Sequence, residues 1–520
     1  MARAPTRSSR RGGSERGGSG SPRTSPGSDG HAVPAAPGAA WLGRWLGWLT
    51  VPRLWLVVVL GAIGAMQLAV GPNAVDLAYH VRAGALMVSS GHVLRTDVFA
   101  WPTAGQPWLD QNWGAQLVLY GLWRVGGFPL IAVANALVTV AAWGLVMAAC
   151  RRRTASLRVI AGGVLAAHAG AMFIFAARPQ MFSVLLFAVE LNLLELARRR
   201  PRVLIALPVL MAVWVNLHGA FVVGLAVLGI DGAVAVARRD RPASLRLLLT
   251  GAASVLALLL NPWGPGVFRY VVDLAGDRSV TAGVTEWAPT TVRDPAGAAL
   301  LGAMAVLVVA LARGGSPARA ADQLARVVPL AALALWTARA GVWFGLVLPL
   351  ALAALARERA PRPASDDRAS PLMTAVLLLV VALAITVAAP GVRERLVPGV
   401  ASRPALASAP AATADWLAAH PQAGRMLNYQ PWGSYLEFQL GPAVKPAVDS
   451  RIELTTADFW SDYHAIMAGR WDAQRLLAAH GIAYVVTDAE ATPDLVADLE
   501  DSAGWRLAFA HHEERVYLRR

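Results

Sequence analysis

Charged residues are scarce in this chain, and their scarcity excludes a soluble protein of this size. Only 15% of the 520 residues are charged, whereas 56% are hydrophobic, and the mean hydropathy is +0.47. A soluble chain needs a larger charged fraction to cover its surface. The apolar residues also gather in runs long enough to cross a bilayer. The composition therefore predicts a membrane protein with several spans and a soluble tail.

Cysteine and the common catalytic and nucleotide-binding motifs are also lacking. Cys150 is the single cysteine, so the sequence predicts neither an internal disulfide nor a cysteine-based zinc site. No GxGxxG or P-loop pattern indicates a nucleotide site, and no GxSxG pattern indicates a serine hydrolase.

The net charge of +14 does not indicate a nucleic-acid partner, because of where the charge lies. Residues 391–520 carry 12 basic and 16 acidic side chains, a net charge of −4. The positive excess lies in the N-terminal arm and the membrane part, whereas a nucleic-acid binder gathers basic residues on one binding surface. We therefore expect no nucleic acid among the partners.

Composition divides the chain into four parts. Residues 1–40 are rich in Ser, Gly, Pro and Arg, and they predict a disordered basic arm rather than a cleavable signal peptide. Residues 41–389 contain the apolar runs and predict a multi-span membrane domain. A linker rich in Pro and Ala, 390–411, leads to residues 412–520, whose alternating helix and strand patterns predict a soluble α/β domain.

Eleven apolar runs are candidate membrane spans, so the predicted fold class is mainly α, with a polytopic helical membrane domain before the α/β domain. Three pairs of runs, within 157–197, 203–237 and 323–356, predict helical hairpins. The eleven runs are residues 52–71, 127–149, 157–177, 181–197, 203–217, 219–237, 244–260, 297–312, 323–337, 341–356 and 371–389.

The distribution of arginine predicts the orientation of these spans. With the N-terminus in the cytoplasm, the inner segments contain 27 basic residues and the outer segments up to residue 389 contain 8. Basic residues prefer the cytoplasmic side of a membrane. Eleven spans then place the C-terminal domain on the outer side of the membrane, together with two long loops, 72–126 and 261–296.

Charged residues in the tail and at the cytoplasmic helix ends are interpreted as structural, namely the pair Asp449 and Arg451 in the tail and the acids Glu190, Glu195 and Asp231 in the spans. Glu195 and Asp231 lie near the cytoplasmic ends of spans, where Arg198 and Arg238 are within pairing distance along the helix. The tail predicts helices and a set of strands at 425–429, 444–448, 482–487, 505–510 and 514–519.

Asp76 and His80 open the first long loop with a spacing of four residues, so on a helix they share one face. A carboxylate at the outer membrane edge can act as a general base or bind a divalent cation, and a histidine can orient it. The alternative is that Asp76 merely caps a helix.

The same loop contains further acids among tryptophans. Asp97, Asp110 and Trp108 suit the recognition of a sugar, because aromatic rings stack on sugar faces while carboxylates accept hydrogen bonds from hydroxyls. An interfacial aromatic belt is the equally open alternative.

Arg178 and Arg339 each lie in a tight turn between apolar helices at a predicted outer helix end. Burying an arginine at this depth is energetically unfavourable unless it pairs with an anion. A guanidinium group binds a lipid phosphate well, because it can donate two hydrogen bonds to it. The alternative is an arginine that extends to the headgroups. His218, near a third outer helix end, and Glu286, in the second long loop, are candidate contacts to an acceptor, or else they stabilise their own loops.

An ordered set of short motifs resembles the GT-C superfamily of polytopic glycosyltransferases, in particular bacterial members with a small extracytoplasmic C-terminal domain. The motifs are VDLAYH with Asp76, TDVFAWPTAGQPW, QNWG, RPQ, WVNLHGAF, NPWG followed by TEW, YQPWGSYL and VDSR. The likeness covers nearly the whole chain from about residue 50.

This resemblance implies a polyprenyl-phosphate-linked sugar as donor and a glycan, lipid or protein as extracytoplasmic acceptor. It implies that Asp76 is the catalytic base or a ligand of a divalent cation, Mg²⁺ or Mn²⁺. The paired acidic motif common in such enzymes is absent, since Leu77 follows Asp76. Two alternatives stay open, namely a transporter of lipid-linked sugars and a non-catalytic scaffold for assembly of the cell envelope.

Overall fold

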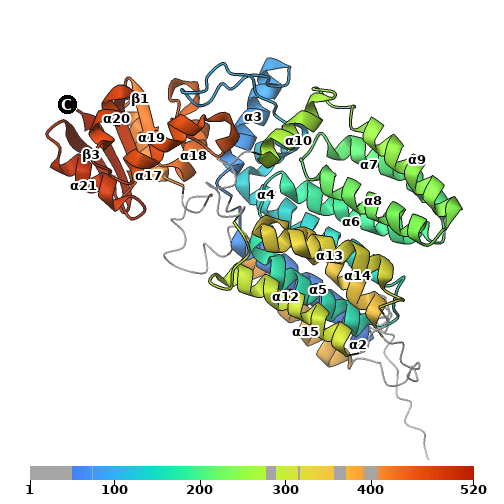
Figure 1. Ribbon diagram of the computed structural model, residues 1–520. Helices are drawn as coiled ribbons and strands as arrows, with labels where there is room; N and C mark the ends of the chain where they lie inside the picture. The colour runs from blue at the N-terminus through green and yellow to red at the C-terminus, as the bar shows by residue number, and fades with distance from the viewer. Residues whose placement is uncertain are drawn as a thin grey trace, which may run out of the picture. The chain divides into compact units, whose positions relative to one another are not determined.

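The computed structural model describes residues 50–72, 74–276, 288–313, 317–356, 370–389, 392, 406 and 409–520, which all fall within one compact unit, Leu49–Arg520. Helices make up most of this part of the chain, and its C-terminal end carries a four-stranded sheet (Figure 1). The predicted mainly α class with a small α/β tail is confirmed at this level.

The apolar runs form helices whose first turns carry the expected signals. Ser156, Asp240 and Asp294 each accept a hydrogen bond from a backbone N–H of the helix that follows. The helices before the tail are α2 (Val51–Val70), α3 (Leu77–Ser90), α4 (Trp113–Cys150), α5 (Leu157–Ala171), α6 (Gln180–Ala197), α7 (Ala206–Trp214), α8 (Phe221–Ala237), α9 (Arg241–Ala257), α10 (Gly266–Gly276), α12 (Pro295–Ala312), α13 (Ala321–Trp336), α14 (Gly341–Leu355) and α15 (Pro371–Ala388).

Each of the eleven predicted spans coincides with a helix, although the number that cross the membrane stays a prediction. Within the described residues, five helices are both long and apolar enough to cross by themselves, namely α2, α4, α6, α12 and the segment Ala338–Leu355 that includes α14. Four more apolar helices are shorter. The orientation of the chain also stays a prediction.

Helix α4 joins the first long loop to a span through a kink. Gly126 and Gly127 have non-helical backbone angles, and Gly127 has a φ of 64°, which a residue with a side chain rarely adopts. Pro129 follows and cannot donate a backbone hydrogen bond. The predicted span beginning at residue 127 therefore starts at this kink.

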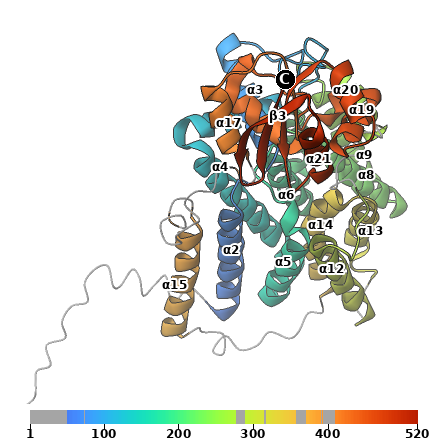
Figure 2. The same ribbon diagram turned by 90° about the vertical axis from the view of Figure 1, so that its left-hand side faces the viewer.

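Tertiary packing corrects two of the three predicted hairpins. Helix α5 packs against α12 and α14, and α6 packs against α4, so the two helices within 157–197 are not each other's main partners. Within 203–237, α7 and α8 both pack mainly on α9. Only α13 and α14 pack along one another as predicted, while α15 lies beside α2 (Figure 2).

The buried acids near the predicted cytoplasmic helix ends form ion pairs with arginines other than those that the sequence suggested. Glu195 accepts from Arg153 and from Arg326, whose Nη1 lies 3.0 Å from Glu195 Oε1. Arg326 also pairs with Asp231. Arg198 instead contacts Asp322, 2.6 Å away. The expected pairing of Glu195 with Arg198 and of Asp231 with Arg238 is therefore wrong, because α13 brings closer partners.

The tail folds as a mixed sheet with helices on both faces. The strand order is β1 (Arg425–Asn428), β2 (Ile482–Asp488), β4 (Glu514–Arg519) and β3 (Trp505–His511), with β1 and β2 parallel and the other pairs antiparallel. The helices of the tail are α17 (Ala411–Ala419), α18 (Gly433–Leu440), α19 (Ala457–Met467), α20 (Ala473–Ala479) and α21 (Pro493–Asp501).

The predicted strand at 444–448 is not a strand. The Asn428 side chain accepts hydrogen bonds from the backbone N–H groups of Ala447 and Val448, and donates one to the Val448 carbonyl at 2.9 Å. These contacts satisfy backbone groups that would otherwise need a neighbouring strand. The segment therefore runs extended against the end of β1 without joining the sheet.

Candidate active site

Asp76 lies at the N-terminal end of α3, at the start of the first long loop. His80 follows one helical turn later, and its Nε2 lies 3.7 Å from Asp76 Oδ2. The His80 side chain is 2% exposed, whereas the Asp76 side chain keeps 19%. The predicted pair on one helical face is therefore present, with the carboxylate as its accessible member.

Gln116 of α4 fixes the other side of the His80 ring. Its Nε2 lies 3.2 Å from His80 Nδ1 and donates to Asp110 Oδ1 at 2.8 Å. In this amide orientation Nδ1 accepts the hydrogen bond, so the ring proton resides on Nε2 and points toward Asp76. Sequence reasoning missed Gln116, although it lies two residues beyond the QNWG motif.

Both predicted arginines act on Asp76 electrostatically. Arg178 lies in the turn before α6 and is 8% exposed, and Arg339 lies in the short turn Ala338–Ala340 between α13 and α14. Burial raises the pKa of Asp76, but the nearby His80 ring and the charges of Arg178 and Arg339 outweigh it and hold the pKa well below its usual range. The structure thus brings these four residues into one electrostatic neighbourhood.

His80 stays neutral in this setting. Burial lowers the pKa of His80, and the charges of Arg178 and Arg451 lower it further, whereas the contact with Asp76 opposes the shift. A neutral imidazole that donates through Nε2 holds Asp76 without neutralising its charge.

His218 also belongs to this group, in the turn between α7 and α8. Its Nδ1 lies 2.9 Å from Ser183 Oγ and accepts from the Ala220 backbone N–H. Burial lowers the pKa of His218 well below its usual value, and the charges of Arg339 and Arg178 lower it further. The neighbouring Asn216 accepts from Trp113 Nε1 at 3.0 Å, which fastens this turn to the start of α4.

Asp110 is buried behind His80 and differs from Asp76 in charge. Burial raises its pKa to about 8, against the opposing effects of Arg451 and of the hydrogen bond from Gln116. Asp110 is therefore mostly protonated at neutral pH. It belongs to the inner support of the site and is 2% exposed.

Asp97 and Trp108 both contact Arg451 of the tail. Arg451 of the tail donates to Asp97 Oδ1 at 2.6 Å, and Thr103 donates to the other oxygen. The Arg451 guanidinium lies 4.8 Å from the centre of the Trp108 ring and also pairs with Asp449. The first loop and the tail are thus joined by a buried charged cluster, and Glu286 falls outside the described residues.

Several buried polar atoms around Asp76 lack a hydrogen-bond partner among the described residues. Native proteins pair such atoms with protein groups, water or ligand. Four of them belong to residues 110–116, whose Gln116 contacts His80, and the others belong to Asp76 and Gln180, so this region is a candidate place for a polar ligand. The atoms are Asp76 Oδ1, Asp110 Oδ2, Gln111 Nε2, Asn112 Oδ1, Gln116 Oε1 and Gln180 Oε1.

A complete metal site is not formed by the part of the chain that the structure describes. No group of three or more His, Cys, Asp or Glu side chains in that part is arranged to hold a metal ion. Asp76 offers one unpartnered carboxylate oxygen, whereas Mg²⁺ and related ions need more oxygen ligands. A divalent cation stays a prediction, and no chemical step below depends on one.

No protein-family model matches the sequence, and no curated protein matches it either. Among solved structures, the chain is similar to the archaeal oligosaccharyltransferase AglB from Archaeoglobus fulgidus in complex with an inhibitory peptide and a dolichol-phosphate. The TM-score is 0.50 and the sequence identity 12%, over 90% of this chain and 74% of that one.

Two other solved structures match less closely. The apo form of the A. fulgidus oligosaccharyltransferase gives a TM-score of 0.49 at 12% identity, over 89% of this chain and 74% of that one. The arabinofuranosyltransferase AftD from Mycobacteria gives 0.45 at 18% identity, over 90% of this chain and 40% of that one. The first similarity, at a TM-score of 0.50, shows that the chain shares its overall fold with the archaeal oligosaccharyltransferase.

Proposed function

We propose that this protein is a membrane glycosyltransferase that moves a sugar from a polyprenyl-phosphate-linked donor to an acceptor hydroxyl on the outer side of the membrane. The proposal rests on one observation above all. An ionised, partly exposed Asp76 lies within the electrostatic reach of two arginines, Arg178 and Arg339, at the ends of apolar helices. A base beside a phosphate-binding pair is what such a transfer needs.

Asp76 acts as the general base. Its Oδ2 faces the Nε2–H of His80, and its Oδ1 has no hydrogen-bond partner among the described residues. The Asp76 carboxylate, 19% exposed, takes the proton of the acceptor hydroxyl while the hydroxyl oxygen attacks the anomeric carbon. The bond from that carbon to the phosphate oxygen breaks, and polyprenyl phosphate leaves with the electron pair.

Arg178 and Arg339 stabilise the charge that grows on the leaving phosphate. A guanidinium binds phosphate oxygens through two parallel N–H groups, and it is more effective in a site that excludes water. Gln111 and Gln180 carry unpartnered amide atoms in the same region and suit contacts to sugar hydroxyls.

Donor binding tunes the basicity of Asp76. In the free protein His80 and the two arginines together hold the pKa of Asp76 so low that it is a weak base. When the donor phosphate pairs with these arginines, it offsets their charge, and the pKa of Asp76 rises toward a value suited to proton transfer. The base therefore becomes effective only when donor is present.

The solved complex of the archaeal oligosaccharyltransferase supports a lipid-linked donor, since it contains a dolichol-phosphate, a long-chain lipid phosphate. The tail also approaches the candidate site, because Glu453 influences the pKa of both Tyr79 and Asp110. We propose that the tail shapes the side on which an extracytoplasmic glycan, lipid or protein acceptor enters.

The test is transfer by purified protein in lipid nanodiscs, supplied with a panel of radiolabelled polyprenyl-phosphate sugars, with and without divalent cation. Asp76→Asn keeps the size and hydrogen-bonding capacity of the side chain but removes the base, so we expect transfer to fall by about 10²–10⁴-fold. The matched control is Asp273→Asn, which removes an exposed acid of α10 and leaves transfer unchanged.

Unchanged transfer by Asp76→Asn would remove Asp76 from the mechanism. If the wild-type protein instead moves the intact labelled lipid between leaflets without breaking the sugar–phosphate bond, the protein is a transporter. Thermal unfolding of both variants in the same nanodiscs separates lost chemistry from lost folding.

A further inference from the structure

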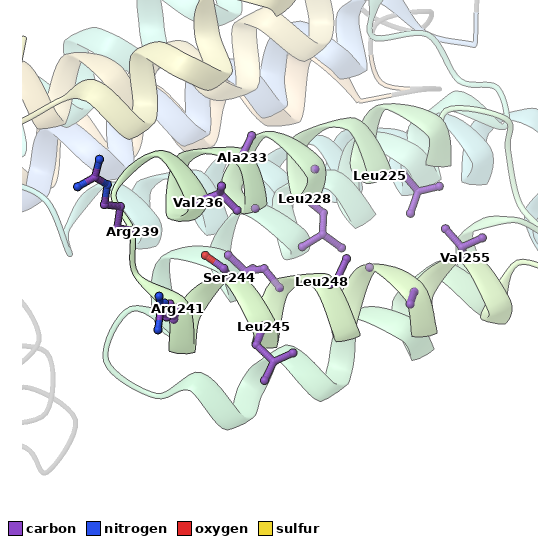
Figure 3. Close-up of a pocket in the computed structure, with 15 residues that line it drawn as sticks. Leu225, Leu228, Ala233, Val236, Arg239, Arg241, Ser244, Leu245, Leu248 and Val255 are labelled. Carbon is purple, nitrogen blue, oxygen red and sulfur yellow. The ribbon is translucent and has the colours of Figure 1, made fainter.

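A long apolar groove runs between α8 and α9, away from the candidate active site. It has a volume of about 880 Å³, and aliphatic side chains such as Leu225, Leu228 and Val255 line most of its length (Figure 3). Leu245 and Leu248 of α9 are 57% and 68% exposed along this region. In a membrane helix such an apolar surface faces lipid tails.

Three glycines border the groove. At Gly229, Gly232 and Gly251 an added Cβ atom would meet no atom within 4 Å, so these positions border empty space and not a neighbouring helix. Glycine in the interior of a helix is unfavourable relative to alanine by about 1 kcal/mol. These three positions are open on the groove side, and a larger side chain there would extend into the groove.

One end of the groove is positively charged. Arg239 and Arg241 border it at the turn between the two helices, next to Ser244 (Figure 3). Both side chains are exposed, and within the described residues neither forms an ion pair with a carboxylate. The intervening Asp240 caps α9 through the Ala243 N–H. Arg239 has a φ of 57°, an unusual backbone conformation that places it at the tip of the turn.

The charged end lies far from Asp76. Helix α8 begins three residues after His218 and ends at Ala237, so its 17 residues separate the two places by about 25 Å at 1.5 Å per residue. The lining of α8 from Leu225 to Val236 spans about 17 Å, close to the thickness of one leaflet, which is about 15 Å.

We propose that this groove is a binding site for one anionic glycerophospholipid of the cytoplasmic leaflet. An acyl chain fills the apolar length, and the phosphate pairs with Arg239 and Arg241. Charge complementarity favours an anionic headgroup over a zwitterionic one. The lipid stabilises the α7–α9 group of helices and takes no part in sugar transfer, so the site is independent of the proposed function.

The test is the lipid retained by the purified protein from nanodiscs that contain equal amounts of phosphatidylglycerol and phosphatidylcholine with identical acyl chains. Native mass spectrometry counts each lipid. We expect preferential retention of phosphatidylglycerol, and a drop in that preference of about five-fold for each arginine removed in Arg239→Gln and Arg241→Gln. The control Arg199→Gln/Arg200→Gln removes two exposed arginines from another predicted inner turn and leaves the preference unchanged.

Filling the groove gives a second, charge-independent test. Gly229→Leu and Gly251→Leu should abolish retention of both lipids at this site, whereas Gly302→Leu, at an open position on α12, should not. The proposal is overturned if the wild-type protein shows no headgroup preference, if the control arginine variants lose it equally, or if the retained molecule is a polyprenyl phosphate.

Discussion

The pKa of Asp76 is subject to opposing influences, and their balance decides whether its carboxyl group is ionised. Burial favours the neutral acid, while His80 and two arginines favour the carboxylate. For Asp110, which Gln116 links to His80, burial outweighs the charge of Arg451 and raises the pKa to about 8. One buried polar network therefore contains both an ionised and a neutral carboxyl group. Acid–base catalysis commonly uses two carboxyl groups whose pKa values differ in this way.

This balance predicts the pH dependence of transfer. The base must be ionised, so activity falls as the pH drops through the pKa of Asp76. Because that pKa is depressed in the free protein, kcat/KM should show no acid limb above about pH 4, whereas kcat, which reports the donor complex, should show one at higher pH. Arg178→Gln should move the kcat/KM limb upward. Identical limbs for both parameters in steady-state assays would contradict the coupling.

The close packing of α3 on α4 positions His80 against Gln116. Gly84 lies at the contact, where an added Cβ would come within 2.3 Å of the Gln116 carbonyl oxygen and 2.7 Å of Tyr120 Cβ. Only glycine permits this approach. The spacing between two helices thus sets the hydrogen bond that orients the histidine.

Gly84→Ala should therefore separate the two helices. We expect a loss of about 1–3 kcal/mol in the free energy of unfolding from overpacking, and a lower transfer rate because His80 loses its partner. Gly121→Ala, on α4 where an added Cβ meets nothing within 4 Å, is the matched control and should be neutral or slightly stabilising. Thermal unfolding and transfer assays of both variants measure the difference, and equal behaviour would refute the argument.

At the scale of the whole molecule, the first loop and the tail share one core. Leu77 and Val81 of α3 belong to the same buried cluster as Tyr484 and Val486, which project from one face of the sheet. Beside it, Arg451 joins Asp97 of the loop to Asp449 of the tail. The tail is therefore part of the framework that holds α3.

Removing Arg451 should loosen this joint. Arg451→Met leaves Asp97 and Asp449 buried without their cation, and breaking a buried pair in this way costs about 3–5 kcal/mol. We expect faster limited proteolysis near the first loop and weaker transfer. Arg475→Met, which removes an exposed arginine paired with Asp472, should change neither. A cleavage rate unaffected by Arg451→Met would show that the joint adds no stability.

The sequence by itself determined the features that depend on neighbours along the chain. Apolar runs and alternating patterns are local, so the helices and most tail strands were predictable. The four-residue spacing likewise placed His80 beside Asp76. These features need only the geometry of a single element.

Tertiary structure decided everything that depends on which elements meet. It paired Glu195 with Arg326, which lies 131 positions away in the sequence. It also allowed the Asn428 side chain to form hydrogen bonds with the backbone of a segment that the sequence pattern predicted to be a strand. It also supplied Gln116 and turned Asp97 inward to Arg451. A charged or amide side chain can form hydrogen bonds with many different groups. Which of them lies within reach depends on how the apolar faces of the helices and strands pack together.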